Sequence, residues 1–393
     1  MIFLQMRYCW YLPLKFMMSL IIFVIMMNFW NLLRIKSRRE RKIVNKTKYK
    51  RLYGIDLLRV IAMLFIFLFH TYIHLGCNYG IMNVIISQGA IFMVAFFMIS
   101  GFSLYYTYCD SNSTDIKKLT NFYIRRFSAI IPVYLVVYLV YLVVIKTDLS
   151  WIKNLIIAPL ELLLLQSTIG GTKAVLHNSG TWFVSCLGIC YIMFPFLCEI
   201  IKQMNKKILL WFGLVLFIIC GYVPIVVRIF EFNSSYSNPF FRLLEFMIGM
   251  IIAKVYVHSG GRGKKYINLV VLSFSALFTF VWVLQSMKIG NYETYVIIAI
   301  PIFGYSMLCL ARANEFVLHG KMISLANSIC YEFFMAQFFT WGITLKIVKY
   351  IPILNNNCGK VLISFAVCLV EAIVLYRLIT RPVKKIIRNR MKY

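Results

Sequence analysis

Hydrophobic residues occupy the chain in long runs, and polar residues gather in the short segments between these runs. About 20 mostly apolar residues are needed for a helix to cross the hydrocarbon core of a bilayer. From residue 53 onward the alternation therefore predicts ten transmembrane helices. Their ranges are 56–75, 84–107, 127–145, 181–198, 208–227, 239–253, 266–287, 292–311, 322–345 and 361–380.

A further apolar run, Tyr8–Leu33, lies ahead of these ten. Its positive charges follow it, whereas a cleavable signal peptide carries them in front. We interpret it either as an extra membrane anchor with the N-terminus outside, or as a segment that is not made because translation starts later, for example at Met27. The basic linker that follows, residues 34–52, is expected in the cytoplasm.

The segment 149–168 is apolar but contains Pro159 and Glu161, so we interpret it as a helix that lies at the outer surface or dips into the membrane. The distribution of Lys and Arg supports this interpretation. With the segment left outside, the cytoplasmic loops hold 29 of these residues, and the outer loops and N-terminus hold 10. If the segment crossed the membrane, every later loop would change side and the positive-inside bias would disappear.

Composition agrees with this pattern, because 61% of the residues are hydrophobic and only 14% are charged. A soluble globular chain is roughly half apolar and about a quarter charged. The net charge of +29 comes from cations scattered over short loops, so the sequence argues against a nucleic-acid-binding face. The 11 cysteines include no CxxC pair, which argues against a disulfide framework and against a zinc site.

We therefore predict an all-α polytopic membrane protein, a ten-helix transmembrane bundle with one extra N-terminal transmembrane helix. The predicted organisation is an anchor (1–33), a basic cytoplasmic linker (34–52), a transmembrane domain (53–382) and a basic cytoplasmic tail (383–393). Charge asymmetry predicts insertion in the cell membrane with the C-terminus in the cytoplasm.

Polar side chains inside a span are costly and often functional, and the first predicted span of the bundle contains Asp56, Arg59, His70 and, one turn beyond His70, His74. Arg59 and His70 are 11 residues apart, so on a helix they lie within about 20° of one another and about 16 Å apart along the axis. Asp56 precedes Arg59 by three residues and is expected to orient its guanidinium. The alternative interpretations are an arginine that extends to the interface and a histidine that only joins two helices. One shared face favours a functional role.

Other buried polar positions have structural interpretations. Arg242 and Glu245, spaced i,i+3, are predicted to form an ion pair, and Glu332 and Gln337 are expected to pack between helices. The dipeptide 125–126, two arginines at the cytoplasmic start of the third span, is interpreted either as a positive-inside anchor or as a phosphate clamp.

Six short motifs then follow one another over about 340 residues, from Tyr53 to the C-terminus. They are Asp56-x-x-Arg59 with His70; Phe96–Phe102, FFMISGF; Tyr123–Arg126 before Pro132; Thr181–Val184 with Tyr191 and Pro195; Cys330–Gln337; and Leu378–Pro382. In this order and spacing they resemble the acyltransferase 3 family of membrane O-acyltransferases. The chain departs from the family pattern at four positions, which are Ala129 for an arginine, Gly188 for an acidic residue, Gln337 for a histidine and Thr380 for a glutamate.

The resemblance implies an acyl donor, usually acetyl-CoA, that enters from the cytoplasm and a glycan hydroxyl that accepts the acyl group outside. Under it, His70 is the expected general base, and Arg59 binds the donor or polarises its thioester carbonyl. Arg125 and Arg126 are the expected ligands of the donor phosphates. The expected supporting residues are Asp56, Ser100, Trp182, Tyr331 and Gln337. Ser100 is a candidate acyl carrier or, with Gly101, a site of close helix packing.

No resident cofactor or metal is expected; the partners are acetyl-CoA, a glycan or lipid-linked glycan acceptor, and membrane lipid. The alternative from another class is a transporter or flippase for a lipid-linked sugar. Many transporters contain inverted repeats, and no repeat relates residues 56–200 to 208–380. A sensory or structural membrane protein is a third alternative, and the polar residues clustered on one helix argue against it.

Overall fold

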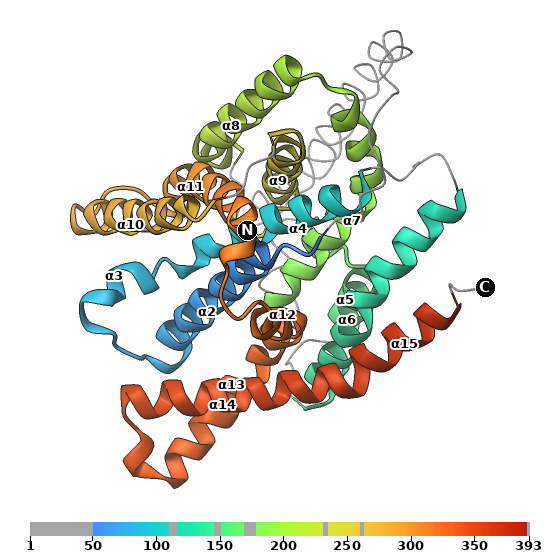
Figure 1. Cartoon of the computed structure of the whole chain (residues 1–393). Helices are drawn as coiled ribbons and strands as arrows, with labels where there is room; N and C mark the ends of the chain where they lie inside the picture. The colour runs from blue at the N-terminus through green and yellow to red at the C-terminus, as the bar shows by residue number, and fades with distance from the viewer. Residues whose placement is uncertain are drawn as a thin grey trace.

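The computed structural model describes residues 50–109, 116–144, 151–168, 178–230, 235–259 and 263–390, and over these ranges it contains helices and no strand. The helices of ten or more residues pack side by side (Figure 1). They are α2 (Tyr53–Leu75), α4 (Phe92–Tyr108), α5 (Ile116–Val144), α6 (Trp151–Leu162), α7 (Trp182–Gln203), α8 (Lys206–Ile229), α9 (Pro239–Ser259), α10 (Lys265–Ser286), α11 (Tyr292–Arg312), α13 (Cys330–Tyr350), α14 (Asn357–Leu375) and α15 (Arg381–Arg390). The predicted N-terminal anchor and most of the basic linker lie outside the described residues.

Eight helical segments in the described part of the chain are long and apolar enough to cross a membrane. They correspond to eight of the ten spans that the sequence predicts. The other two predicted spans fall on α9 and α13, which have 21 residues each but carry charged side chains that lower their hydropathy. The all-helical, multi-span architecture is therefore confirmed, and eight of its helices qualify as spans on length and composition alone.

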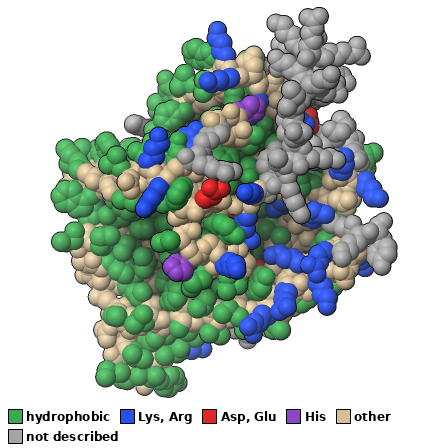
Figure 2. All heavy atoms as spheres, in the orientation of Figure 1, with side chains coloured by type: hydrophobic (Ala, Val, Ile, Leu, Met, Phe, Trp, Pro, Cys, Tyr) green, Lys and Arg blue, Asp and Glu red, His purple; other side chains and the backbone are tan. Residues whose placement is uncertain are grey.

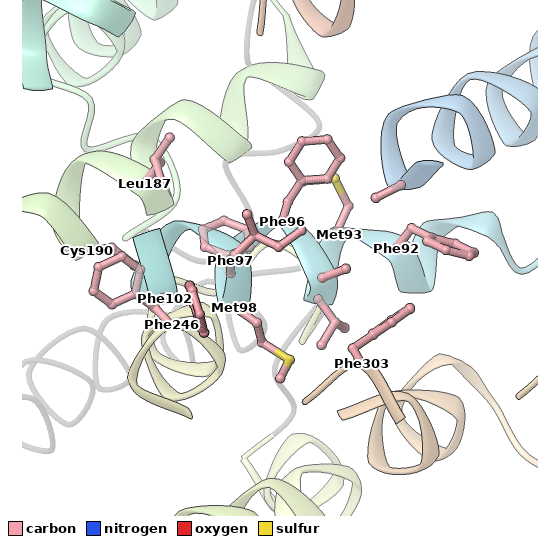
Figure 3. Close-up of a cluster of buried hydrophobic side chains, with 14 of the residues drawn as sticks. Phe92, Met93, Phe96, Phe97, Met98, Phe102, Leu187, Cys190, Phe246 and Phe303 are labelled. Atoms are coloured by element: carbon pink, nitrogen blue, oxygen red, sulfur yellow. The ribbon is translucent and has the colours of Figure 1, made fainter. Parts of the chain in front are cut away.

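Helix α4 lies at the centre of the bundle and packs closely against α9. Two glycines allow this approach: a Cβ added to Gly101 would lie 1.9 Å from the carbonyl oxygen of Phe246, and one added to Gly249 would lie 1.9 Å from that of Met98. Figure 3 shows the side chains of α4, among them Phe97 and Phe102, among those of α7, α9 and α11. Small residues let two backbones approach where lipid supplies no hydrophobic driving force.

The structure divides two of the predicted spans. Residues 84–107 form a short helix α3 (Asn83–Ile86), a 3-10 turn and then α4, and residues 322–345 are split between α12 (Gly320–Ser328) and α13. The second division leaves α12 as a separate element packed against the start of α2. The segment 149–168 contains α6, whose 12 residues rise about 18 Å, less than the thickness of a bilayer core.

The last helical rod is longer than a membrane span. Helix α14 continues through a π-helical turn, Tyr376–Thr380, into α15, which gives 34 consecutive helical residues (Figure 1). Lys and Arg side chains gather over α15 and the neighbouring α5, whereas hydrophobic side chains cover α10 (Figure 2). We call the end of the bundle at which α2 begins and α14 ends the Arg59 end, and the opposite end the His70 end.

The predicted pairing of Arg242 with Glu245 is confirmed. Nη1 of Arg242 lies 2.9 and 2.7 Å from the two carboxylate oxygens, and both side chains are buried. Its Nε donates to the carbonyl oxygen of Tyr236, and its Nη2 donates to the hydroxyl of Tyr292. Because each nitrogen of this guanidinium has a partner, its burial is compensated, and its hydrogen bond to Tyr292 ties α9 to α11.

Candidate functional site

His70 lies near the end of α2 and its imidazole contacts α13. Nδ1 is 2.6 Å from Oε1 of Gln337, an amide oxygen that only accepts hydrogen bonds. With the Gln337 oxygen toward the ring, Nδ1 donates as the protonated nitrogen of the neutral imidazole and Nε2 keeps its lone pair. In this tautomer Nε2 is the nitrogen that can accept a proton, and Gln337, itself fully buried, contacts the other ring nitrogen.

Aromatic rings from α2 and α13 lie around His70. Trp341 meets the imidazole edge-on at 6.1 Å, and Phe334 lies 6.5 Å away. His74, one turn further along α2, is exposed and stacks on Trp341 at 5.6 Å. His70 itself is partly exposed.

Arg59 is held by neutral groups from two other helices. Nη1 donates to Oδ1 of Asn327 on α12 at 2.9 Å, and Nη2 donates to Oγ of Ser103 on α4 at 3.2 Å. Neither partner is charged, so the guanidinium keeps its full positive charge.

The expectation that Asp56 orients Arg59 directly is wrong. Its Oδ2 accepts a hydrogen bond from Nε of Arg51 at 2.7 Å, and its Oδ1 accepts one from Nδ2 of Asn327 at 2.7 Å. The carboxylate thus acts on Arg59 only through Asn327. The i,i+3 spacing makes a direct pair possible, but two other donors occupy both oxygens.

A cavity of about 200 Å³ opens between the ends of α4 and α7 and the start of α5. Its lining is mixed, with aromatic rings next to charged and amide groups: Tyr108, Lys118, Leu119, Asn121, Phe122, Arg125, Phe194, Pro195, Cys198 and Glu199. Ser103, which binds Arg59, and Tyr108, which lines the cavity, are five residues apart on α4, about 8 Å along its axis. The cavity and Arg59 therefore share one end of the bundle.

The two arginines of α5 differ in their surroundings. Arg125 is exposed and lines the cavity, whereas the guanidinium of Arg126 lies 5.0 Å from the ring centre of Tyr108. Nε of Arg126 is buried without a hydrogen-bond partner among the described residues. Three cations, Arg59, Arg125 and Arg126, are thus gathered at the Arg59 end.

The structure places three further predicted residues away from these contacts. The hydroxyl of Ser100 donates to the carbonyl oxygen of Phe96 in its own helix, and the adjacent Gly101 packs against α9. Trp182 lies 5.5 Å from the guanidinium of Arg242, and the hydroxyl of Tyr331 donates to the carbonyl oxygen of Ile130 on α5. The contacts of Ser100 and Gly101 are those of a site of close packing between α4 and α9. Trp182 contacts α9, and Tyr331 links α13 to α5.

Sequence reasoning missed two residues of the site, Asn327 and Ser103. Ser103 is three residues from Ser100 and so lies on a similar face of α4, which is a signal that the sequence offered. Asn327 is 268 residues from Arg59, and no local pattern relates the two. Among the residues that the structure describes, no group of three His, Cys, Asp or Glu side chains is arranged to hold a metal ion.

The family model described as an acyltransferase domain matches residues 52–377, which is most of the chain. The chain belongs to the acyltransferase 3 family. Among curated proteins it is similar to the acyltransferase MdmB of Streptomyces mycarofaciens, with 24% identity over 290 residues that cover 68% of this chain and 70% of the relative. No solved structure shows a significant match. With its multiple apolar helices, this member of the family is a membrane acyltransferase.

Proposed function

We propose that this acyltransferase moves an acyl group, with acetyl as the expected case, from acetyl-CoA to a hydroxyl group of a glycan on the other side of the membrane. The observation that carries the proposal is the arrangement on α2. One helix face presents an unneutralised guanidinium at one end and a half-buried imidazole with a free Nε2 near the other. Donor and acceptor can therefore approach the same helix from opposite ends.

The donor is assigned to the Arg59 end on the basis of charge. Coenzyme A carries several phosphate charges, and Arg59, Arg125 and Arg126 gather at this end beside a cavity with aromatic walls. Guanidinium groups bind phosphate oxygens through charge-assisted hydrogen bonds. The positive-inside distribution supports a cytoplasmic location for this end, where acetyl-CoA is available.

His70 acts as general base in the proposed reaction. Nε2 accepts the proton of the acceptor hydroxyl while the hydroxyl oxygen attacks the thioester carbonyl carbon. The new ester C–O bond forms, the C–S bond breaks, and the proton passes from the imidazolium to the departing thiolate to give free coenzyme A. Gln337 holds Nδ1–H throughout, so one tautomer serves both proton transfers.

The separation of Arg59 from His70 supports one of the two roles expected for Arg59. Arg59 lies about 16 Å along the axis of α2 from His70, several times the length of a hydrogen bond. A carbonyl group attacked beside His70 is therefore out of reach of Arg59. Of the two expected roles, donor binding is the one that this separation supports, with the pantetheine arm extending between the two residues.

The acceptor is proposed to be a glycan, such as capsular or another surface polysaccharide, because a sugar hydroxyl needs a base at neutral pH and His70, which is partly exposed, lies toward the end of α2 opposite Arg59. The test uses membrane vesicles that contain the full-length protein, incubated with acetyl-CoA labelled in the acetyl group. Label should appear in a membrane-associated carbohydrate fraction, as a base-labile ester. Absence of protein-dependent label from every fraction, with the protein inserted, contradicts the proposal.

A further inference from the structure

The carboxamide of Asn327 lies between the carboxylate of Asp56 and the guanidinium of Arg59. Its Oδ1 accepts from Nη1 of Arg59 at 2.9 Å, and its Nδ2 donates to Oδ1 of Asp56 at 2.7 Å. Asn327 comes from α12, the short helix that a break at Ile329 separates from α13. A residue 268 positions away thus occupies the space between two side chains on one face of α2.

Asp56 and Arg59 would otherwise be suited to pair with each other. They are three residues apart on one helix, a spacing at which opposite charges interact. In the structure the carboxylate instead pairs with Arg51 and Asn327, while Arg59 is bound by Asn327 and Ser103. An amide can bridge the two because it offers an acceptor to the guanidinium and a donor to the carboxylate.

This bridge affects the charge that a ligand meets. A guanidinium paired directly with a carboxylate presents little net charge, whereas one held by an amide oxygen and a hydroxyl keeps its charge. We infer that Asn327 is a positioning residue of the donor site: it fixes the Arg59 guanidinium and prevents Asp56 from neutralising it. The inference rests on the proposed function, since it assigns Arg59 to an anionic acyl donor.

The chain offers a matched control in a second asparagine at the same end of α2. Nδ2 of Asn314 donates to the carbonyl oxygen of Arg51 at 3.0 Å, and its Oδ1 accepts from the backbone N–H of Gly54 at 3.4 Å. Asn314 therefore also ties a remote segment to the start of α2, but it does so through hydrogen bonds to the backbone and not through Arg59. If Asn327 served only to hold a remote segment against α2, replacing either asparagine by alanine should weaken coenzyme A binding to a similar extent.

The experiment measures the dissociation constant of coenzyme A for the full-length protein in detergent by calorimetry. Asn327→Ala should bind coenzyme A about tenfold more weakly than the wild type, because Asp56 then pairs with Arg59. Asn327→Asp, which places a carboxylate directly on Arg59, should bind at least as weakly as Asn327→Ala. Asn314→Ala should stay within about threefold of the wild type.

The double variant Asp56→Asn/Asn327→Ala tests whether Asn327 acts by keeping Asp56 away from Arg59 or only by supporting the folded structure. It removes the carboxylate that would neutralise Arg59, so its affinity should return to within about threefold of the wild type. A merely structural role for Asn327 predicts instead that the double variant binds no better than the single one. That result, or equal affinities for the wild type and Asn327→Ala, overturns the inference alone. Failure of the wild type to bind coenzyme A contradicts the proposed donor and the inference together.

Discussion

Nδ1 of His70 lies 2.6 Å from Oε1 of Gln337, a contact that joins α2 to α13 and leaves Nε2 as the nitrogen that can accept a proton when Nδ1 is the donor. The family pattern that the sequence resembles has a histidine at the position of Gln337. In this chain a buried amide supplies the acceptor instead. The catalytic base and its support thus come from segments more than 260 residues apart, and each depends on the other for orientation.

Replacing Gln337 by Leu should lower kcat for acyl transfer about 10-fold to 100-fold and leave the KM for acetyl-CoA within about twofold. The reason is that leucine removes the acceptor of Nδ1–H, so the ring loses its fixed tautomer, while the donor site at the other end is untouched. Steady-state kinetics in membrane vesicles checks this. Thr340→Ala is the control, because Thr340 is on the same helix and donates to Glu371 instead of contacting His70. Equal losses in both variants would argue against a specific role for Gln337.

Replacing Arg125 or Arg126 by Ala should weaken coenzyme A binding about 3-fold to 10-fold for each residue. Each substitution removes a cation beside the cavity at the Arg59 end. The dependence of the dissociation constant on salt should also become less steep, since fewer charges contribute. The control is Lys264→Ala, which removes an exposed cation next to α10. An unchanged salt dependence in the arginine variants contradicts the phosphate-binding role.

Breaking the buried pair on α9 should destabilise the protein by about 3–5 kcal/mol, because it leaves one charge buried without its partner. Arg242→Leu and Glu245→Leu are the single variants, and the double variant should be less destabilised than either of them. The measurement is thermal unfolding in detergent, monitored by circular dichroism. A double variant that loses as much stability as the two single variants together would show that the two side chains act independently.

Gly101→Ala should destabilise the protein by about 1–3 kcal/mol, because its new Cβ would overlap the backbone of α9 at Phe246. Gly342→Ala is the matched control, since a Cβ at this exposed helical glycine meets nothing within 4 Å. Its melting temperature should stay the same or rise slightly, as alanine favours a helix. Similar melting temperatures for the two variants contradict the close packing of α4 on α9.

Helix positions and the shared face of Arg59 and His70 are local properties, and periodicity predicted them. The apolar runs in the sequence also located α9 and α13. Both helices carry charged residues, such as Arg242 and Glu332, and neither is among the segments that qualify as membrane spans by length and composition. The break between α12 and α13 falls in Ser328-Ile329-Cys330, where no proline or glycine marks it.

The partners of Arg59 and His70, which are Asn327 and Gln337, come from distant segments that tertiary packing brings to α2. The sequence pointed to Gln337 but not to Asn327. Gln337 occupies a histidine position of a family motif, and this position alone identified it as a candidate site residue. Asn327 lies three residues before this motif, so the motif did not identify it. The spacing of Asp56 and Arg59 favoured a direct pair between the two instead. Only the packing of α12 on α2 brings the amide between them.

The most direct test of the account compares His70→Ala with His74→Ala in the transfer of labelled acetyl groups from acetyl-CoA to the membrane-associated acceptor. His74 is one turn away and exposed, so it controls for the loss of an imidazole from the same end of α2. At equal amounts of inserted protein, His70→Ala should lower the rate at least about 100-fold, and His74→Ala less than about 10-fold. A His70→Ala variant that transfers acetyl groups at the wild-type rate would contradict the assignment of His70 as the general base.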